Sequence, residues 1–381
     1  MSVMQVTYWC SVAALSAFSV GLARDRNLSA ALIGVMAALY KLAAVFGQFF
    51  WGGLCDKTGG NKKIFAAANG ITILASLGFY FFPGNYSMLL FYALLGFVQV
   101  PAASVLDTWV ITYMTRKGSS SYGPIRSMGS LGYAVFIFFY GMMIAKYGYA
   151  VMPWFFTVFS VLTILAAKTV PDAKTVNERK KKMNLSEIAE LFKNRTYFFL
   201  LLILFFDGMA CFSFGQMKIL VWEAMHASIA FQGYDGFAGA IAQVPAMFIA
   251  SQMIRFDAKK RLIAGVFLDM SMLIICYFAK TPQLIIAGSV ISGFGYGLLL
   301  PAMRQIILKE SPDTLRTTAQ GLGDAIYGNF SSMIGCVLAG AIIDALGIKA
   351  MILCCIGTEF AAVILAVLFA AGSVKPQKPA L

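Results

Sequence analysis

Three polar residues stand inside otherwise apolar stretches, at a spacing that suits the binding of a hydroxylated solute. Asp107 precedes Arg126 by nineteen residues, and Tyr133 follows Arg126 by seven. Seven residues advance an α-helix by about two turns, so Arg126 and Tyr133 are expected on one helical face. A carboxylate accepts hydroxyl protons, a guanidinium donates hydrogen bonds, and an aromatic ring stacks on a flat apolar face. The alternative is an Asp107–Arg126 ion pair that only joins two helices.

Two further ionisable residues lie in the middle of apolar stretches, where an unpaired charge is costly enough to suggest a function. Lys41 has Gln48 two turns further on along the same face, and we expect it to face a cavity. There it would pair with a carboxylate or meet an anionic substrate; pairing between helices alone is the other reading. Asp207 shares a face with Cys211 and Phe214, which makes it the best cavity carboxylate of the second half of the chain.

A polar stripe lies within the apolar stretch 317–345, with members three and four residues apart. Its members are Thr317, Gln320, Asp324, Tyr327 and Ser331. A stripe of this period lies on one helical face, so it is expected to face a wet cavity. Gln243 is a weaker candidate for contact with a solute. Lys218, Asp235 and Arg304, near the ends of their apolar stretches, are expected to snorkel toward water.

The amino-acid composition indicates that most of the protein surface faces lipid and not water. Of 381 residues, 60% are hydrophobic and 12% are charged, whereas soluble domains carry about 25% charged residues. The seven cysteines form no C-x-x-C pair, so neither a disulfide framework nor a metal site is expected. An all-α integral membrane protein without a cofactor is predicted.

Apolar stretches long enough to cross a bilayer occur twelve times, in two sets of six. The first set lies near 4–22, 29–53, 64–82, 88–114, 125–145 and 150–169. The second set lies near 197–221, 231–253, 262–279, 283–308, 317–345 and 350–372. The predicted domains are therefore a six-helix bundle over 1–170, a basic linker over 171–196, and a second bundle with a short tail over 197–381.

The positive charge is placed as expected for a multi-pass membrane protein. The linker holds the basic run Arg179–Lys182, and most other Lys and Arg fall in the loops on the same side. The excess of basic residues marks cytoplasmic loops, so both termini are predicted to be cytoplasmic. This asymmetry accounts for most of the net charge of +13 without nucleic acid as a partner.

The segment after the second span reads Gly-Gly-Leu-Cys-Asp-Lys-Thr-Gly-Gly-Asn-Lys-Lys over 52–63. It resembles the G-x-L-x-D-[RK]-x-G-[RK]-[RK] loop of the major facilitator superfamily, with Gly60 and Asn61 at places that are usually basic. The resemblance implies that fold, with two pseudo-symmetric six-helix bundles, and a loop that gates the cytoplasmic mouth. The gating residues that it implies are Gly52, Asp56, Lys57, Gly59 and Lys62.

The region of Asp107, Arg126 and Tyr133 resembles the lactose permease and its relatives, the oligosaccharide, nucleoside and phenylpropionate proton symporters. The permease spacing between carboxylate and arginine is one residue shorter. In this superfamily helices 3, 6, 9 and 12 are peripheral, which implies only supporting roles for Asp269 and Glu359.

The proton-coupling residues of the permease have no match here. The tenth span carries no acidic residue, and the single histidine, His226, falls in a loop. If protons drive transport, the remaining carriers are Asp107, Asp207 and Asp324.

The expected function is secondary active transport of a small polar solute by alternating access, coupled to protons, in a bacterial plasma membrane. A sugar, glycoside or nucleoside is favoured, with contacts from Asp107, Arg126, Tyr133, Lys41, Asp207, Gln243 and Tyr327. An organic anion such as an aromatic or short-chain carboxylate is the alternative, and a lipid flippase or a sensor on the same fold is a lesser one. No H-E-x-x-H or G-x-S-x-G motif occurs, so an enzyme is not expected; a monomer is.

Overall fold

The computed structural model describes residues 1–58, 60–116, 122–172, 191–252, 257–312 and 315–371, and nearly all of them are helical. By the contacts among Cα atoms the chain forms two compact units. One unit holds residues 1–180 and 219–237, and the other holds 181–218 and 238–381. Most of the segment predicted as a linker lies outside the described residues, and each unit is considered by itself below.

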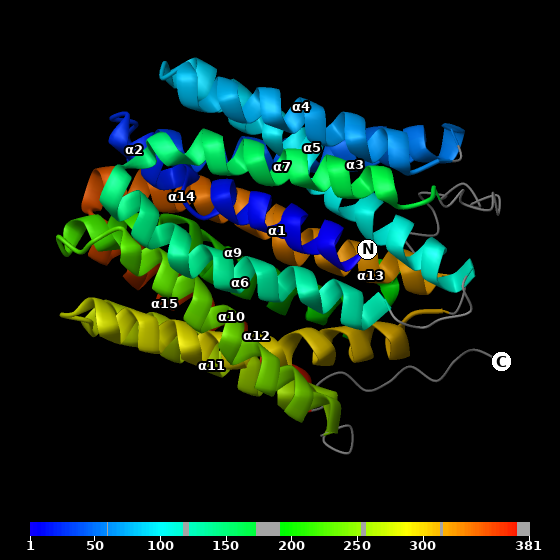
Figure 1. The fold of residues 1–381 in the computed structure, drawn as a ribbon. Helices are drawn as coiled ribbons and strands as arrows, with labels where there is room; N and C mark the ends of the chain where they lie inside the picture. The colour runs from blue at the N-terminus through cyan, green and yellow to red at the C-terminus, as the bar shows by residue number, and fades with distance from the viewer. Residues whose placement is uncertain (59, 117–121, 173–190, 253–256, 313–314, 372–381) are drawn as a thin grey trace. The chain divides into compact units, whose positions relative to one another are not determined.

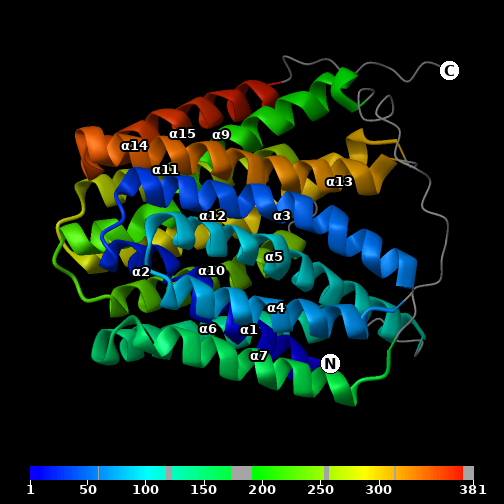
Figure 2. The same ribbon diagram turned by 90° about the horizontal axis from the view of Figure 1, so that it is seen from above.

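The helices follow the predicted spans closely (Figures 1 and 2). In chain order they are α1 (Ser2–Ser16), α2 (Ser19–Asp25), α3 (Ala30–Thr58), α4 (Lys62–Phe81), α5 (Asn85–Arg116), α6 (Tyr122–Tyr147), α7 (Met152–Thr169), α9 (Arg195–Ala224), α10 (Ala230–Gln252), α11 (Ala258–Phe278), α12 (Pro282–Glu310), α13 (Arg316–Asp324), α14 (Ser331–Leu346) and α15 (Ile348–Ala370). The first predicted span is divided between α1 and α2, and the eleventh between α13 and α14.

Eleven helical stretches in the described part of the chain are long and apolar enough to cross a bilayer. The eighth predicted span coincides with α10, which is not among the eleven. Although α10 has 23 residues, it carries the polar side chains of Gln232, Asp235 and Gln243. The fold is an all-helical membrane fold.

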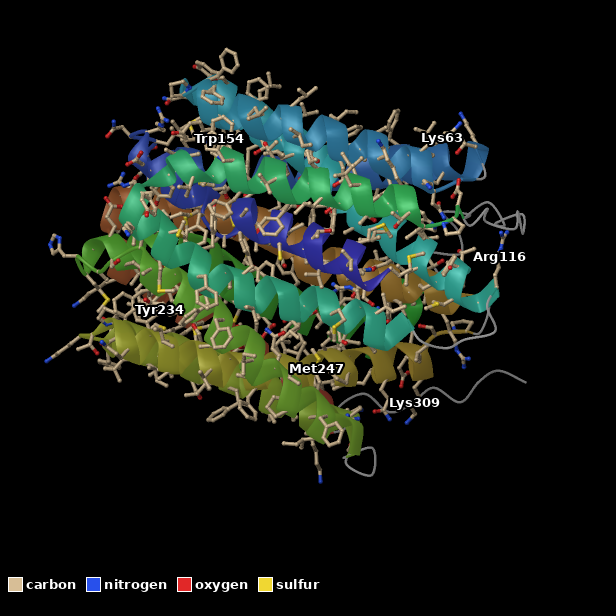
Figure 3. The ribbon with its side chains drawn as sticks, viewed as in Figure 1. Lys63, Arg116, Trp154, Tyr234, Met247 and Lys309 are labelled. Atoms are coloured by element: carbon tan, nitrogen blue, oxygen red, sulfur yellow. The ribbon has the colours of Figure 1, made fainter. Side chains whose placement is uncertain are left out.

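In the first unit, α5 packs against α3 and α4, while α1 packs against α6 and α7. Figures 1 and 2 show α4 running beside α5 and α7. Large aromatic residues fill its core, among them Tyr8, Phe65 and Trp109, each at most 2% exposed. Lys63 and Arg116 lie at one end of this unit and Trp154 toward the other (Figure 3).

In the second unit, α11 packs against α12 and α15, and α14 also packs against α15. Its core contains Tyr197, Leu204, Leu299 and Met303, all fully buried. A π-helical segment (Ala325–Phe330) joins α13 to α14. Such insertions in a helix occur frequently at functional sites, because the extra residue per turn redirects nearby side chains.

The loop between α3 and α4 is fastened to the end of α7 inside the first unit. Asp172 accepts hydrogen bonds from the backbone nitrogens of Asn61 (3.1 Å) and Lys62 (3.2 Å). The Nζ of Lys62 donates to the carbonyl oxygens of Lys168 (2.7 Å) and Val170 (2.9 Å). Asp172 therefore acts as the acidic cap at the start of α4, a role that the sequence analysis did not assign to it.

Helices α3 and α5 approach so closely that only glycine fits at two places. A Cβ on Gly96 would lie 2.1 Å from the carbonyl oxygen of Tyr40, and one on Gly47 would lie 2.0 Å from that of Phe97. Because both obstacles are backbone atoms, no side-chain movement relieves the clash. Close contact between small residues is a general way for membrane helices to associate.

We expect Gly96→Ala to lower the free energy of unfolding by about 1–3 kcal/mol, the usual cost of overpacking. Thermal unfolding in detergent measures it. Gly70→Ala in α4 is the matched control, because its Cβ would meet no atom within 4 Å, and alanine favours a helix over glycine. Equal stability of the two variants would contradict the packing that the structure shows.

Candidate functional site

An ion pair joins α5 to α6 in the first unit. The Nε of Arg126 lies 3.6 Å from Oδ1 of Asp107, and each side chain is 28% exposed. Asp107 lies in the last third of α5 and Arg126 near the start of α6, both inside stretches apolar enough to cross a bilayer, where a charge without a partner is costly. The structure therefore brings together two of the three residues that the sequence placed in a solute site.

Helix α1 adds two residues that the sequence analysis missed. Gln5 is fully buried and donates its amide hydrogen to Oδ1 of Asp107 at 2.9 Å. Trp9, one turn further on, donates its indole N–H to the amide oxygen of Gln5 at 2.9 Å. The guanidinium carbon of Arg126 lies 4.2 Å from the centre of the Trp9 ring, which is a cation–π geometry.

These contacts form one connected network across three helices. Trp9 bonds Gln5, Gln5 bonds Asp107, Asp107 pairs with Arg126, and Arg126 stacks on Trp9. Arg126 also donates to the hydroxyl of Ser130 at 3.2 Å. A carboxylate, a guanidinium and a large aromatic face thus lie side by side, and these are the groups that bind a hydroxylated or aromatic solute.

The backbone of α6 allows this arrangement through Gly129, where a Cβ would lie 2.4 Å from Cδ1 of Trp9. On α1, Tyr8 is 2% exposed and donates from its hydroxyl to the carbonyl oxygen of Gln99 on α5 at 2.6 Å. The network is therefore held by the close contact of α1 with α6 and by a hydrogen bond from α1 to α5.

The other predicted residues of the first unit lie on neighbouring helices. Tyr133 lies on α6, two turns after Arg126, and its side chain is half-buried. Lys41 lies on α3 and is half-buried as well, whereas Gln48 is exposed. Of the gating residues, Gly52 and Lys57 lie in the last turns of α3, and Lys62 bonds the end of α7. The side chain of Asp56 and the whole of Gly59 lie outside the described residues.

The second unit contains an ion pair in the corresponding place, between the tenth and eleventh spans. Arg304 of α12 lies 2.8 Å from Asp324 at the end of α13, with exposures of 42% and 43%. Arg304 also donates to the amide oxygen of Gln320 at 2.7 Å, and Gln320 returns a bond to the Arg304 carbonyl at 3.0 Å. Arg304 is thus held by neighbours within its bundle.

The remaining candidates of the second unit lie deeper. Tyr327 in the π-helical segment is 5% exposed, and its ring stacks on that of Tyr296 at 6.5 Å between centres. Asp207 on α9 is fully buried. Gln243 on α10 is half-buried, and His226 is exposed, as expected.

The expected snorkelling is wrong for Asp235, whose side chain is 6% exposed, and for Lys218. The side chain of Lys218 is 8% exposed, and its Nζ donates to the hydroxyl of Ser289 on α12 at 2.7 Å. The ammonium group also lies 5.4 Å from the centre of the Phe214 ring. The position of Lys218 in the sequence suggested contact with water, but its ammonium group contacts a hydroxyl group inside the bundle.

The chain resembles known transporters in sequence and in fold. The MFS_1 like family model matches residues 1–353. An uncharacterized transporter of Bacillus subtilis (strain 168), YwbF, is 26% identical over 341 residues, covering 88% of this chain and 84% of the relative. The maltose permease of Geobacillus stearothermophilus is 23% identical over 84% of this chain and 81% of its own.

Among solved structures, the nucleoside transporter NupG matches with a TM-score of 0.81 at 15% identity, covering 99% of this chain and 98% of that one. A bacterial homologue of the human lysosomal transporter Spinster matches with a TM-score of 0.75 at 12% identity, covering 100% and 97%. These matches show the fold, and the family match covers most of the chain. The chain belongs to the MFS_1 like family and is a multi-pass secondary transporter of the major facilitator superfamily.

Proposed function

We propose that this transporter moves a neutral polar solute of the sugar, glycoside or nucleoside class by alternating access, coupled to protons. The observation that carries the proposal is the network of Gln5, Trp9, Asp107 and Arg126 in the first unit. It offers donors, acceptors and an aromatic face within a few ångströms of one another. Such a set recognises hydroxyl groups together with a flat apolar surface.

The charges favour a neutral solute over an organic anion. Arg126 is paired with Asp107, and Arg304 is paired with Asp324. A carboxylate substrate would have to displace one of these aspartates, and the displaced carboxylate would then lack its partner in an apolar bundle. Lys41 keeps the anion alternative open, because it is the remaining mid-span lysine among the predicted site residues.

The relatives support the same class. The curated relative with a stated substrate is a maltose permease, and a solved structure of the same fold is a nucleoside transporter. Both solutes carry several hydroxyl groups on a ring. Because the identities are low, these likenesses support the substrate class and do not select one compound.

The proposal includes two six-helix halves joined by the basic segment 171–196, with both termini on the cytoplasmic side of a bacterial plasma membrane. The loop 52–63 would gate the cytoplasmic mouth. Asp107, Asp207 and Asp324 are the proposed proton carriers. The proposal for Asp107 and Asp324 is supported by their position in partly exposed ion pairs within the two bundles.

Neutralising either member of the first ion pair should weaken solute binding strongly. We expect Asp107→Asn and Arg126→Gln each to weaken binding by at least tenfold, since hydrogen bonds to charged groups contribute about 1.5–3 kcal/mol. Substrate counterflow in proteoliposomes measures the loss. The control is Arg24→Gln, which breaks the exposed Arg24–Glu223 pair (3.0 Å) in the same unit. Normal binding by both site variants would reduce the pair to a clamp between helices.

The ring of Trp9 should contribute to solute binding as a flat stacking surface. We expect Trp9→Phe to keep measurable exchange and Trp9→Ala to lose it, because only the second change removes the stacking surface. Counterflow with panels of sugars, nucleosides and aromatic carboxylates tests the class at the same time. Exchange of carboxylates alone would favour the organic-anion alternative, and exchange of no panel would count against transport of these classes.

The ion pair of the second unit should matter more for transport than for stability. Because Arg304 and Asp324 are both partly exposed, breaking the pair is expected to change the free energy of unfolding by less than about 1 kcal/mol. We expect Asp324→Asn nevertheless to lower uptake driven by a proton gradient, while counterflow at equal pH continues. A large loss of stability without a change in uptake would show a structural role only.

A further inference from the structure

A cavity of about 250 Å³ lies in the first unit and shares no residue with the network described above. Its walls come from the end of α2, from Tyr149 before α7, and from the segment 219–229 at the end of α9. All of these belong to the first unit. Figure 3 shows Lys63 at one end of this unit, whereas α2 lies at the other end (Figure 1). Because the loop 52–63 is the proposed cytoplasmic gate, this outer cavity lies on the opposite side of the membrane.

The phenol of Tyr149 reaches the outer cavity through the space left by a glycine. A Cβ on Gly21 would lie 2.1 Å from the hydroxyl oxygen of Tyr149 and 2.5 Å from Cδ1 of Ile219. Gly21 and Asp25 are four residues apart on α2, so they lie on one face of this helix. The hydroxyl of Tyr149 is also close enough to Asp25 for an electrostatic interaction. The sequence therefore places a carboxylate and a phenol side by side in this cavity.

Two other polar residues of the outer cavity satisfy each other. The Nε of Arg24 lies 3.0 Å from Oε2 and 3.3 Å from Oε1 of Glu223. Asp25 is exposed, and neither its carboxylate nor the hydroxyl of Tyr149 has a hydrogen-bond or ion-pair partner in the described part of the chain. The capacity of the cavity to bind a ligand by hydrogen bonds therefore belongs to Asp25, which offers acceptors, and to Tyr149, which offers a donor and an acceptor.

The rest of the wall is apolar and includes Ile219, Leu220, Ala227 and Ile229. A carboxylate and a hydroxyl beside an apolar wall suit a ring that has hydroxyl groups on its edge and C–H groups on its face. The size of the cavity agrees with one ring, because pockets for larger small molecules measure about 300–1,000 Å³.

An organic cation fits the outer cavity less well than a neutral ring. Asp25 is exposed, and an ion pair at an exposed carboxylate contributes little to binding. Arg24 lines the same cavity and repels a second positive charge. Shape and hydrogen bonds therefore select the ligand here, and both favour a hydroxylated ring.

We propose that Asp25 and Tyr149 bind the transported solute at a second, outer site, separate from the Asp107–Arg126 network. The ligand is one ring of a sugar, glycoside or nucleoside, held through its hydroxyl groups. The inference rests on the function proposed above for the identity of the solute, whereas binding in the outer cavity is measured without transport. A site at this end of the unit holds solute at the outer mouth of the transporter.

The outer site is tested in purified protein whose inner network is weakened by Arg126→Gln. We expect saturation-transfer NMR titrations with maltose and with uridine to show weak binding of at least one of them. Adding Asp25→Ala should weaken this binding at least tenfold and adding Tyr149→Phe about fivefold, because each removes a hydrogen bond. Ala227→Trp, which fills the cavity, should abolish it. Tyr147→Phe removes an exposed phenol that does not line the cavity and should leave it unchanged.

Thermal unfolding shows whether each variant folds, and Asp25→Ala decides if Ala227→Trp does not, because position 25 is exposed. Binding that Asp25→Ala and Tyr149→Phe leave unchanged would overturn the inference, as would no binding of either compound by the Arg126→Gln protein. Binding of choline alone would make the cavity a site for cations and would overturn it as well. Normal counterflow by the wild type combined with any of these results would overturn the outer site alone. Absent counterflow would count against the proposed function and would not alter the binding measured here.

Discussion

Charges inside an apolar helix bundle need a partner within reach, because the lipid around the bundle offers none. Each unit of this protein meets that requirement with an arginine and an aspartate on adjacent helices. In the first unit Arg126 and Asp107 join α6 to α5, and in the second Arg304 and Asp324 join α12 to α13. In the first unit, where both side chains are 28% exposed, removing one partner would leave the other as a largely buried isolated charge, which costs more than the pair does; the more exposed pair of the second unit is less sensitive.

The two ion pairs occupy corresponding places in the chain but have opposite polarity. The fourth span carries the aspartate in the first half, whereas the tenth span carries the arginine in the second. Each pair also has a glutamine attached: Gln5 binds Asp107, and Gln320 binds Arg304. The glycines with positive φ repeat in the same way, since Gly148 (72°) precedes α7 and Gly347 (85°) precedes α15. The internal repeat is therefore visible in turns and in polar contacts, although the side chains have diverged.

The sequence predicted the helices well, because a hydrophobic stretch of sufficient length in lipid has few alternatives to a helix. It also placed Asp107 and Arg126 together, as a solute site or an ion pair, from the types of the residues and their spacing. It could not identify Gln5 and Trp9, because these residues look like ordinary members of an apolar span until α1 is placed against α5 and α6. Lys218 was misread for a similar reason, since its partner Ser289 lies 71 residues further along the chain.

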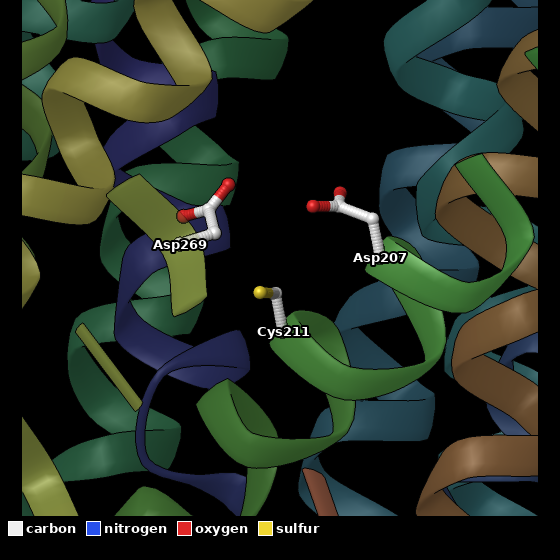
Figure 4. A group of neighbouring side chains, drawn as sticks. All are labelled: Asp207, Cys211 and Asp269. Carbon is white, nitrogen blue, oxygen red and sulfur yellow. The ribbon is translucent and has the colours of Figure 1, made fainter. Parts of the chain in front are cut away.

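The three buried carboxyl groups show most clearly what a linear reading omits. Asp207, Asp269 and Glu359 lie in three spans that are far apart in sequence, and each alone resembles a tolerated polar residue. The structure brings the three side chains to one place (Figure 4 shows the two aspartates), where no described cationic side chain lies against them. The aspartates paired with arginine have a counter-charge within their bundle, whereas these three acids have no cationic partner among the described residues and depend on one another and on neighbouring hydroxyl and thiol groups.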